Sequence, residues 1–195
     1  MRLVLGLGNP GPRYANTRHN IAWQVLDTLA SRFGASGEET TGRYRARTSR
    51  IGEHDVDLVQ PLTFMNLSGE ALVEWEQRHG RDPGALLVVT DDVYLPLGML
   101  RLRASGSSGG HRGLESIESA MGHREYARLR VGVGAAESSA ALRDHVLDEF
   151  APEEQPALGD AIHRAADAVE TWVREGIVPA MNQFNRRVRM EDSES

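Results

Sequence analysis

Short apolar runs recur along the chain in the pattern typical of buried strands. Residues 2–7 and 85–92 each hold several consecutive apolar side chains, which suits a strand that is covered on both faces of a sheet. An alternating run over 98–104 and an apolar run over 128–134 predict two further strands. These four segments are therefore expected to supply the core of a sheet.

A further pair of strands is predicted over residues 43–51 and 55–60, joined by a turn around Gly52. The first of them is rich in arginine. Because charged side chains are typical of strands that border solvent, we expect this strand at an edge of the sheet.

Between the strands, apolar residues fall at the three- and four-residue spacing of amphipathic helices. The first such segment ends at Gly34, a residue that commonly stops a helix. The predicted helices are 19–33, 68–79, the segment after the 105–113 loop that contains Leu114, Ile117 and Met121, and two acidic segments over 139–150 and 152–176.

Strands that alternate with helices place the chain in the α/β class. A length of 195 residues suits one layered domain, for which we expect the bounds 1–188. Residues 189–195 are acidic and polar, and we expect a flexible C-terminal tail there.

Composition removes several kinds of chemistry. The chain has no cysteine, which excludes disulfides, thiolate metal sites and cysteine nucleophiles. All 22 basic residues are arginine, so a lysine Schiff base and a P-loop lysine are excluded as well. The apolar run at the N-terminus is too short for a signal peptide or a membrane span, and a cytoplasmic protein is expected.

The net charge of −6 argues mildly against a polyanionic partner, but the charges are unevenly distributed. Residues 1–135 carry 16 arginines against 15 acidic residues, whereas 136–195 carry 6 against 13. Arginines also surround the 105–113 glycine and serine loop. A locally basic rim beside a cleft would suit phosphates.

The segment GLGNPG at 6–11 follows a strand and matches the Gly-x-Gly-x-x-Gly pattern of dinucleotide-binding turns. However, Pro10 and Pro12 lack the N–H groups that a phosphate would need at this place. The alternative is a tight turn that presents the Asn9 amide to a cleft.

Four polar residues lie in loops expected beyond the carboxyl ends of strands, namely Asn9, His19, Asp91 and His111. In an α/β sheet such loops converge on one crevice, so these side chains are candidates for a shared site. His19 can serve as a general base near neutral pH. No pair of histidines has metal-ligand spacing with a carboxylate on one helix face, so no metal is expected. Asn66, just before a helix, either caps it or contacts a peptide-like substrate.

Five segments occur in the order seen in bacterial-type peptidyl-tRNA hydrolases, which this chain resembles. The resemblance covers about residues 1–150. Its segments are GLGNPGPRYANTRHN (6–20), PLTFMNLSG (61–69), DDVYLPLG (91–98), SGSSGGHRGL (105–114) and RLRVGVG (128–134), with a terminal MNQFN at 181–185.

The resemblance implies a phosphorylase/hydrolase-like α/β fold with a twisted, mixed and mostly parallel sheet flanked by helices. It further implies a cytoplasmic monomer, without cofactor or metal, that cleaves the ester between the peptide and the 3′ ribose of peptidyl-tRNA and so recycles tRNA from aborted translation.

Carried over by position, His19 matches the family's catalytic histidine, Asp91 the aspartate paired with it, and Asn9 a catalytic asparagine. Asp91 would fix the tautomer of His19, which takes a proton from water. Asn9 or Asn66 would then donate to the oxyanion. The expected contacts to the peptide or tRNA are Tyr14, Phe64, Met65, Asn66, His111, Arg112, Arg103 and Arg130.

Two departures from the family pattern leave an alternative open. Arg112 stands where asparagine is usual, and residues 135–143 differ from the usual segment after GVG. The alternative is a non-catalytic RNA-binding member of the same fold family. A nucleotide-cofactor enzyme that uses GLGNPG is a more distant one.

Overall fold

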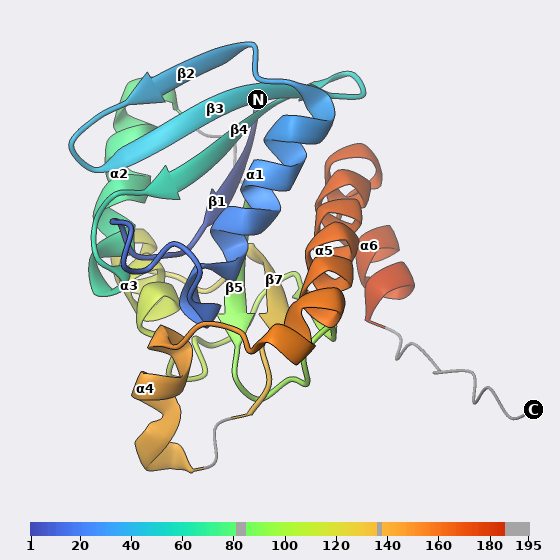
Figure 1. Cartoon of the computed structure of the whole chain (residues 1–195). Coiled ribbons are helices and arrows are strands. Elements are labelled where there is room, and N and C mark those ends of the chain that lie inside the picture. The colour runs from blue at the N-terminus through green and yellow to red at the C-terminus, as the bar shows by residue number, and fades with distance from the viewer. Residues whose placement is uncertain (81–84, 136–137, 186–195) are drawn as a thin grey trace, which may run out of the picture.

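A seven-stranded sheet forms the centre of the protein in the computed structural model, which describes residues 1–80, 85–135 and 138–185 (Figure 1). The order of its strands is β2-β3-β4-β1-β5-β7-β6. The strands are β1 (Arg2–Gly6), β2 (Gly37–Thr40), β3 (Tyr44–Ile51), β4 (His54–Pro61), β5 (Leu86–Asp92), β6 (Leu100–Arg103) and β7 (Ala127–Gly132).

The four central strands are parallel, since β1 pairs in parallel with β4 and β5, and β5 pairs in parallel with β7. The outer pairings β2–β3, β3–β4 and β6–β7 are antiparallel. The predicted α/β class with a mixed, mostly parallel sheet is confirmed. All seven residues of β5 are buried, which explains its continuous apolar run.

Helices cover both faces of the sheet (Figure 1). One face packs against α1, α5 and α6, whose apolar sides share a core with the sheet, and the other packs against α2 and α3. The helices are α1 (Ile21–Phe33), α2 (Ser68–His79), α3 (Arg112–Met121), α4 (Leu142–Leu147), α5 (Gln155–Glu175) and α6 (Ile177–Phe184).

The short helix α4 differs from the others because none of its residues is fully buried. It lies beside the end of the sheet to which the parallel strands point (Figure 1). The helix predicted over 139–150 is shorter in the structure, since α4 covers only Leu142–Leu147. A 3-10 turn over Ser139–Ala141 precedes it.

The prediction that residues 43–51 form an edge strand is wrong. A further strand, β2, pairs with β3 on its outer side and is itself the edge. Its sequence, GEET, has no apolar residue, so the hydrophobic pattern did not reveal it. The pattern also missed α6, which follows α5 directly after Gly176.

No helix in the described ranges has both the length and the apolar character needed to cross a membrane. The predicted acidic tail over 189–195 lies outside the described residues, as does the predicted domain end at 188.

Candidate active site

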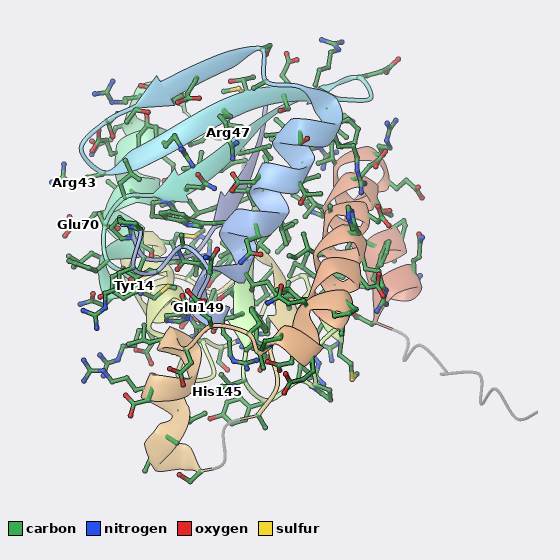
Figure 2. The ribbon with its side chains drawn as sticks, in the orientation of Figure 1. Tyr14, Arg43, Arg47, Glu70, His145 and Glu149 are labelled. Atoms are coloured by element: carbon green, nitrogen blue, oxygen red, sulfur yellow. The ribbon has the colours of Figure 1, made fainter. Side chains whose placement is uncertain are left out.

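A cavity of about 440 Å³ opens where β1 and β5 end. All of the predicted site residues except Arg103 line it, and helix α4 contributes Leu142, Arg143, Val146 and Leu147. Figure 2 shows Tyr14, on the loop after β1, and His145, on α4, on the same side of the molecule. The expected convergence of loops beyond the parallel strands is thus present in the structure.

His19 and Asp91 form a close pair at the floor of this cavity. Nδ1 of His19 lies 2.9 Å from Oδ1 of Asp91, whose side chain is 1% exposed. His19 belongs to a single 3-10 turn, Arg18–Asn20, directly before α1, while Asp91 is near the end of β5. Because Nδ1 donates to the carboxylate, Nε2 carries the lone pair, and no group in the described part of the chain bonds to it.

His19 and Asp91 each shift the pKa of the other. Burial lowers the pKa of His19, but the charge of Asp91 and the hydrogen bond to it outweigh burial and hold that pKa above its ordinary value of 6.5. Burial works to raise the pKa of Asp91, yet the attraction of His19 and His111 and their hydrogen bonds keep it well below its ordinary range. Asp91 therefore stays ionised while His19 titrates.

A second imidazole, His111, reaches the same carboxylate oxygen. Its Nε2 lies 2.8 Å from Oδ1 of Asp91 and 2.7 Å from the hydroxyl oxygen of Thr90. Its Nδ1 accepts hydrogen bonds from the backbone N–H groups of Gly113 and Leu114, at the N-terminus of α3. Asp91 is thus held between two histidines from different loops.

The Asn9 side chain has a defined orientation. Its Oδ1 accepts a 2.8 Å hydrogen bond from the backbone N–H of Met65, so its NH₂ group is the end that remains available in the cavity. Asn20 holds the Asn9 backbone from behind: its Oδ1 accepts from the Asn9 N–H and its NH₂ donates to the Asn9 carbonyl, both at 2.9 Å. Asn20 is fully buried and was missed by the sequence reasoning.

The loop of the GLGNPG motif does not have the form of a dinucleotide-binding turn. Gly11 lies in a turn with φ of +103°, and α1 begins only at Ile21. The Asn9 N–H is already bonded to Asn20, and residues 10 and 12 are prolines without N–H groups. The loop presents a side-chain amide instead of a row of backbone donors for a phosphate.

Apolar and amide side chains form the wall of the cavity near α2. Met65 is buried beside Asn9, whereas Phe64 is 56% exposed and Asn66 is also exposed. Tyr14 lines the same cavity. Together these side chains form a lining that can accept an extended, partly apolar group.

The three predicted basic contacts lie in different surroundings. Arg112 is exposed at the cavity, and in the described ranges it has no acidic partner. Arg130 is partly engaged, because it donates to the carbonyl oxygens of Ser107 and Ser108 and lies 3.5 Å from Asp92. Arg103 is exposed on the edge strand β6 and does not line the cavity.

His19, Asp91 and His111 place one potential ligand atom each within 4.8 Å of one another, which is close enough to hold a metal ion. The hydrogen bonds argue for a different use. Both ring nitrogens that face Asp91 carry a proton in this arrangement, and His111 could free its Nε2 only by losing the bonds from Gly113 and Leu114. The absence of a metal stays a prediction, and this donor set agrees with it.

Arg18, next to His19, ties the segment after α4 to the site. Its guanidinium donates to Glu154 and to the Val133 carbonyl, and its backbone N–H donates to the carbonyl of Asp148. Glu149, seen between Tyr14 and His145 in Figure 2, forms a β-bridge with Thr17. Neither Arg18 nor the α4 side chains were among the predicted site residues. The sequence predicts α4 as part of an acidic amphipathic helix with a polar outer face, and nothing around Arg18 marks it as buried.

Comparison with known proteins identifies close relatives over nearly the whole chain. Residues 3–192 match the family model described as "Peptidyl-tRNA hydrolase". The chain is 46% identical over 187 residues to a peptidyl-tRNA hydrolase of Syntrophomonas wolfei, covering 95% of this chain and 100% of that protein. It is 44% identical over 186 residues to that of Chloroflexus aggregans, with 95% and 99% covered. The crystal structure of peptidyl-tRNA hydrolase from Acinetobacter baumannii superposes with a TM-score of 0.88 at 34% identity, covering 95% of this chain and 94% of that one.

Proposed function

This chain belongs to the peptidyl-tRNA hydrolase family, and from that premise we propose that it hydrolyses the ester between the peptide and the 3′-terminal ribose of peptidyl-tRNA. The reaction returns tRNA from aborted translation for reuse. The observation that supports this most directly is the buried His19–Asp91 pair, whose unbonded Nε2 lies in a cavity beside the Asn9 amide.

In this mechanism His19 is the general base. Asp91 accepts the Nδ1 proton of His19, which leaves the lone pair on Nε2 to take a proton from a water molecule. The water oxygen then bonds to the ester carbonyl carbon, and Asp91 stabilises the imidazolium that forms. When the tetrahedral intermediate collapses, the bond to the 3′ oxygen of the ribose breaks, and that oxygen takes the proton from Nε2 of His19. An ester is already activated, so a general base can supply a contribution of ~10²–10⁴ in rate without a metal.

Asn9 is the better of the two candidate oxyanion donors. Its NH₂ group is directed to the cavity because its oxygen is held by the Met65 N–H, and Asn20 fixes its backbone. A donor fixed before the reaction needs no reorganisation when charge develops on the carbonyl oxygen. Asn66 is exposed and has no such restraint in the described structure, so we assign it to the substrate's peptide group.

The remaining predicted residues divide between the two ends of the substrate. Tyr14, Phe64 and Met65 are proposed to contact the peptide and the terminal nucleoside along the wall of the cavity. Arg112, Arg130 and Arg103 are proposed to contact the tRNA phosphates, since they extend from the cavity toward the β6 edge of the sheet. His111 lines the same cavity and has both ring nitrogens bonded within the protein.

The alternative of an RNA-binding relative without hydrolysis is not favoured. The relatives that match are named as hydrolases, and the pair expected to carry the reaction is intact and correctly spaced. We further propose that the protein acts as a monomer in the cytoplasm, where translation supplies its substrate. Light scattering on the purified chain tests the monomer.

The test is release of tRNA from an N-acetylated aminoacyl-tRNA, measured with a chelator present. Wild-type protein is expected to turn over, and His19→Ala to lose at least about 10² of kcat because the base is gone. His163→Ala, which changes an exposed histidine on α5, is the matched control and should keep full activity. Tight RNA binding by the wild type without any turnover would select the non-catalytic alternative.

A further inference from the structure

His111 differs from the other cavity residues because both of its ring nitrogens are bonded within the protein. We propose that His111 is a positioning residue: the first turn of α3 fixes its tautomer, and its Nε2–H holds Asp91 in place against His19. This inference rests on the proposed function and gives His111 a different part from the substrate contact that family resemblance implies.

The tautomer follows from the position of His111 at the start of α3. It is the N-cap residue of this ten-residue helix, and its Nδ1 lies 3.1 Å from the Gly113 nitrogen and 3.3 Å from the Leu114 nitrogen. A nitrogen that accepts from two N–H groups carries no proton. The partial positive charge of the helix N-terminus disfavours a proton there as well. The single proton of the neutral ring is therefore on Nε2.

That proton lies within hydrogen-bond distance of Asp91 and of the Thr90 hydroxyl. Nε2 lies 2.8 Å from Oδ1 of Asp91, and the carboxylate is 1% exposed, so solvent does not compete for this bond. The Thr90 hydroxyl lies 2.7 Å from the same Nε2 and 3.4 Å from Oδ1. Oδ1 of Asp91 thus accepts N–H bonds from His111 and His19 together, at 2.8 and 2.9 Å.

The surroundings of the His111 ring are closely packed. Gly113 has no room for a side chain, since an added Cβ would lie 2.6 Å from Sδ of Met65 and 3.1 Å from Cε1 of His111. The rings of His111 and His19 lie 5.2 Å apart and are tilted by 53°. The first turn of α3, the Met65 wall and the two histidines therefore form one close-packed unit.

Because His111 and His19 share Oδ1 of Asp91, His111 also affects how readily His19 is protonated. A carboxylate that already accepts a hydrogen bond from His111 is a weaker acceptor for His19, so His111 limits how strongly Asp91 favours the protonated form of His19. Removing the His111 donor should then make His19 harder to deprotonate. The other titratable or charged groups on the cavity are Asp92, Arg130, Arg112, Arg143, Tyr14 and Tyr94, and all of them remain in the variants below.

Two substitutions separate the two bonds of His111. Asparagine is among the strongest N-cap residues, and its oxygen can accept from the first turn of α3, but its side chain is too short to reach Asp91. Glutamine is long enough to place an NH₂ group near Asp91 but caps a helix poorly. His111→Asn therefore keeps the cap and loses the Asp91 bond, whereas His111→Gln does the reverse.

The experiment measures kcat, KM, their pH dependence and Tm for both variants and for His163→Ala as a control. For His111→Asn we expect Tm close to wild type, KM within about twofold, kcat lower by roughly tenfold, and an acid limb displaced upward by about 0.5 pH unit or more. For His111→Gln we expect an acid limb close to wild type and a Tm lower by about 2–4 °C.

Two results would overturn the inference. A higher KM with an unchanged kcat and pH profile would make His111 a substrate contact. An unmoved acid limb in both variants would leave it only a structural role.

A readout without substrate separates this inference from the proposed function. In ¹⁵N NMR spectra of the free protein, the His111 ring is expected to show a protonated Nε2 and an unprotonated Nδ1, with its signals assigned by their loss in His111→Asn. A proton on Nδ1 would refute the inference even if the enzyme is active. If the wild type releases no tRNA, the proposed function fails, and the NMR result still decides the tautomer.

Discussion

Two histidine–carboxylate pairs in this protein have nearly the same spacing and very different surroundings. His19 and Asp91 lie 2.9 Å apart in the cavity, and His79 and Glu39 lie 2.7 Å apart beside the edge strand β2. The Asp91 side chain is 1% exposed, whereas Glu39 is 33% exposed. Proximity alone therefore does not distinguish a catalytic pair.

The main difference is burial of the carboxylate and of what surrounds it. Asp91 accepts from a second imidazole, and His19 is followed directly by Asn20, which holds the loop that carries Asn9. His79 stacks on Trp75 at the end of α2, and solvent screens its charge interaction with Glu39. Glu39 also has a second partner, Arg78 at 3.2 Å, so burial and not the number of bonds separates the two carboxylates. A buried carboxylate can set the tautomer and charge of a base, while an exposed one adds little.

The substitution that should separate the two pairs most is removal of each carboxylate charge. Asp91→Asn replaces the charged acceptor with a neutral amide, which neither fixes the tautomer of His19 as strictly nor stabilises the imidazolium, and we expect kcat to fall by about 10²–10⁴. Glu39→Gln should leave kcat within about twofold. Steady-state hydrolysis of N-acetylated aminoacyl-tRNA measures both. Equal activity of Asp91→Asn and Glu39→Gln would remove the distinction drawn between the pairs.

The cavity pair lies beside Asn9, whose amide we propose as the oxyanion donor. Asn9→Ala should lower kcat by about 10²–10³ with little change in KM, because the donor acts on the developing oxyanion. Gln77→Ala, an exposed amide two residues before His79, is the matched control and should behave as wild type. A loss expressed mainly in KM would instead make Asn9 a ground-state contact.

Arg112 at the cavity and Arg78 beside His79 are expected to differ in their contribution to tRNA binding. Arg112→Ala should raise KM by a fewfold, leave kcat unchanged and reduce the slope of log KM against log salt by about one, as for one lost phosphate contact. Arg78→Ala, which removes an ion-paired arginine near His79, should not change the slope. Identical salt slopes for Arg112→Ala and wild type would show that Arg112 does not meet a phosphate.

Regular elements with a strong period were well predicted from the sequence. The helix expected over 68–79 has those bounds in α2, and the strand expected over 85–92 is β5, because their apolar residues repeat at a clear spacing. The strand β2 carries no apolar residue, so burial left no pattern for it in the sequence. Helix α4, which buries none of its residues fully, covers only part of the helix expected over 139–150.

At the site, the sequence predicted which residues meet but not how they are bonded. Asn20 supports Asn9 through two bonds that exist only once the loop has folded back on itself. The hydrogen bonds of Arg130 within the protein could not be predicted either. Their acceptors are the backbone carbonyls of Ser107 and Ser108, which any residue could provide. Side-chain types signal chemistry, but backbone acceptors leave no mark in the sequence.

The dependence of kcat/KM on pH tests most directly whether a His19 base governed by Asp91 carries the reaction, because kcat/KM follows the pKa values of the free enzyme. His19 has a pKa above 6.5 in the folded protein, and only its neutral form accepts a proton, so activity should be lost as pH falls through that raised pKa. Asp91, with its lowered pKa, remains ionised throughout this range. The expected kcat/KM profile has one acid limb with its midpoint above 6.5, whereas a kcat/KM that stays constant from pH 8 down to about pH 5 would contradict the account.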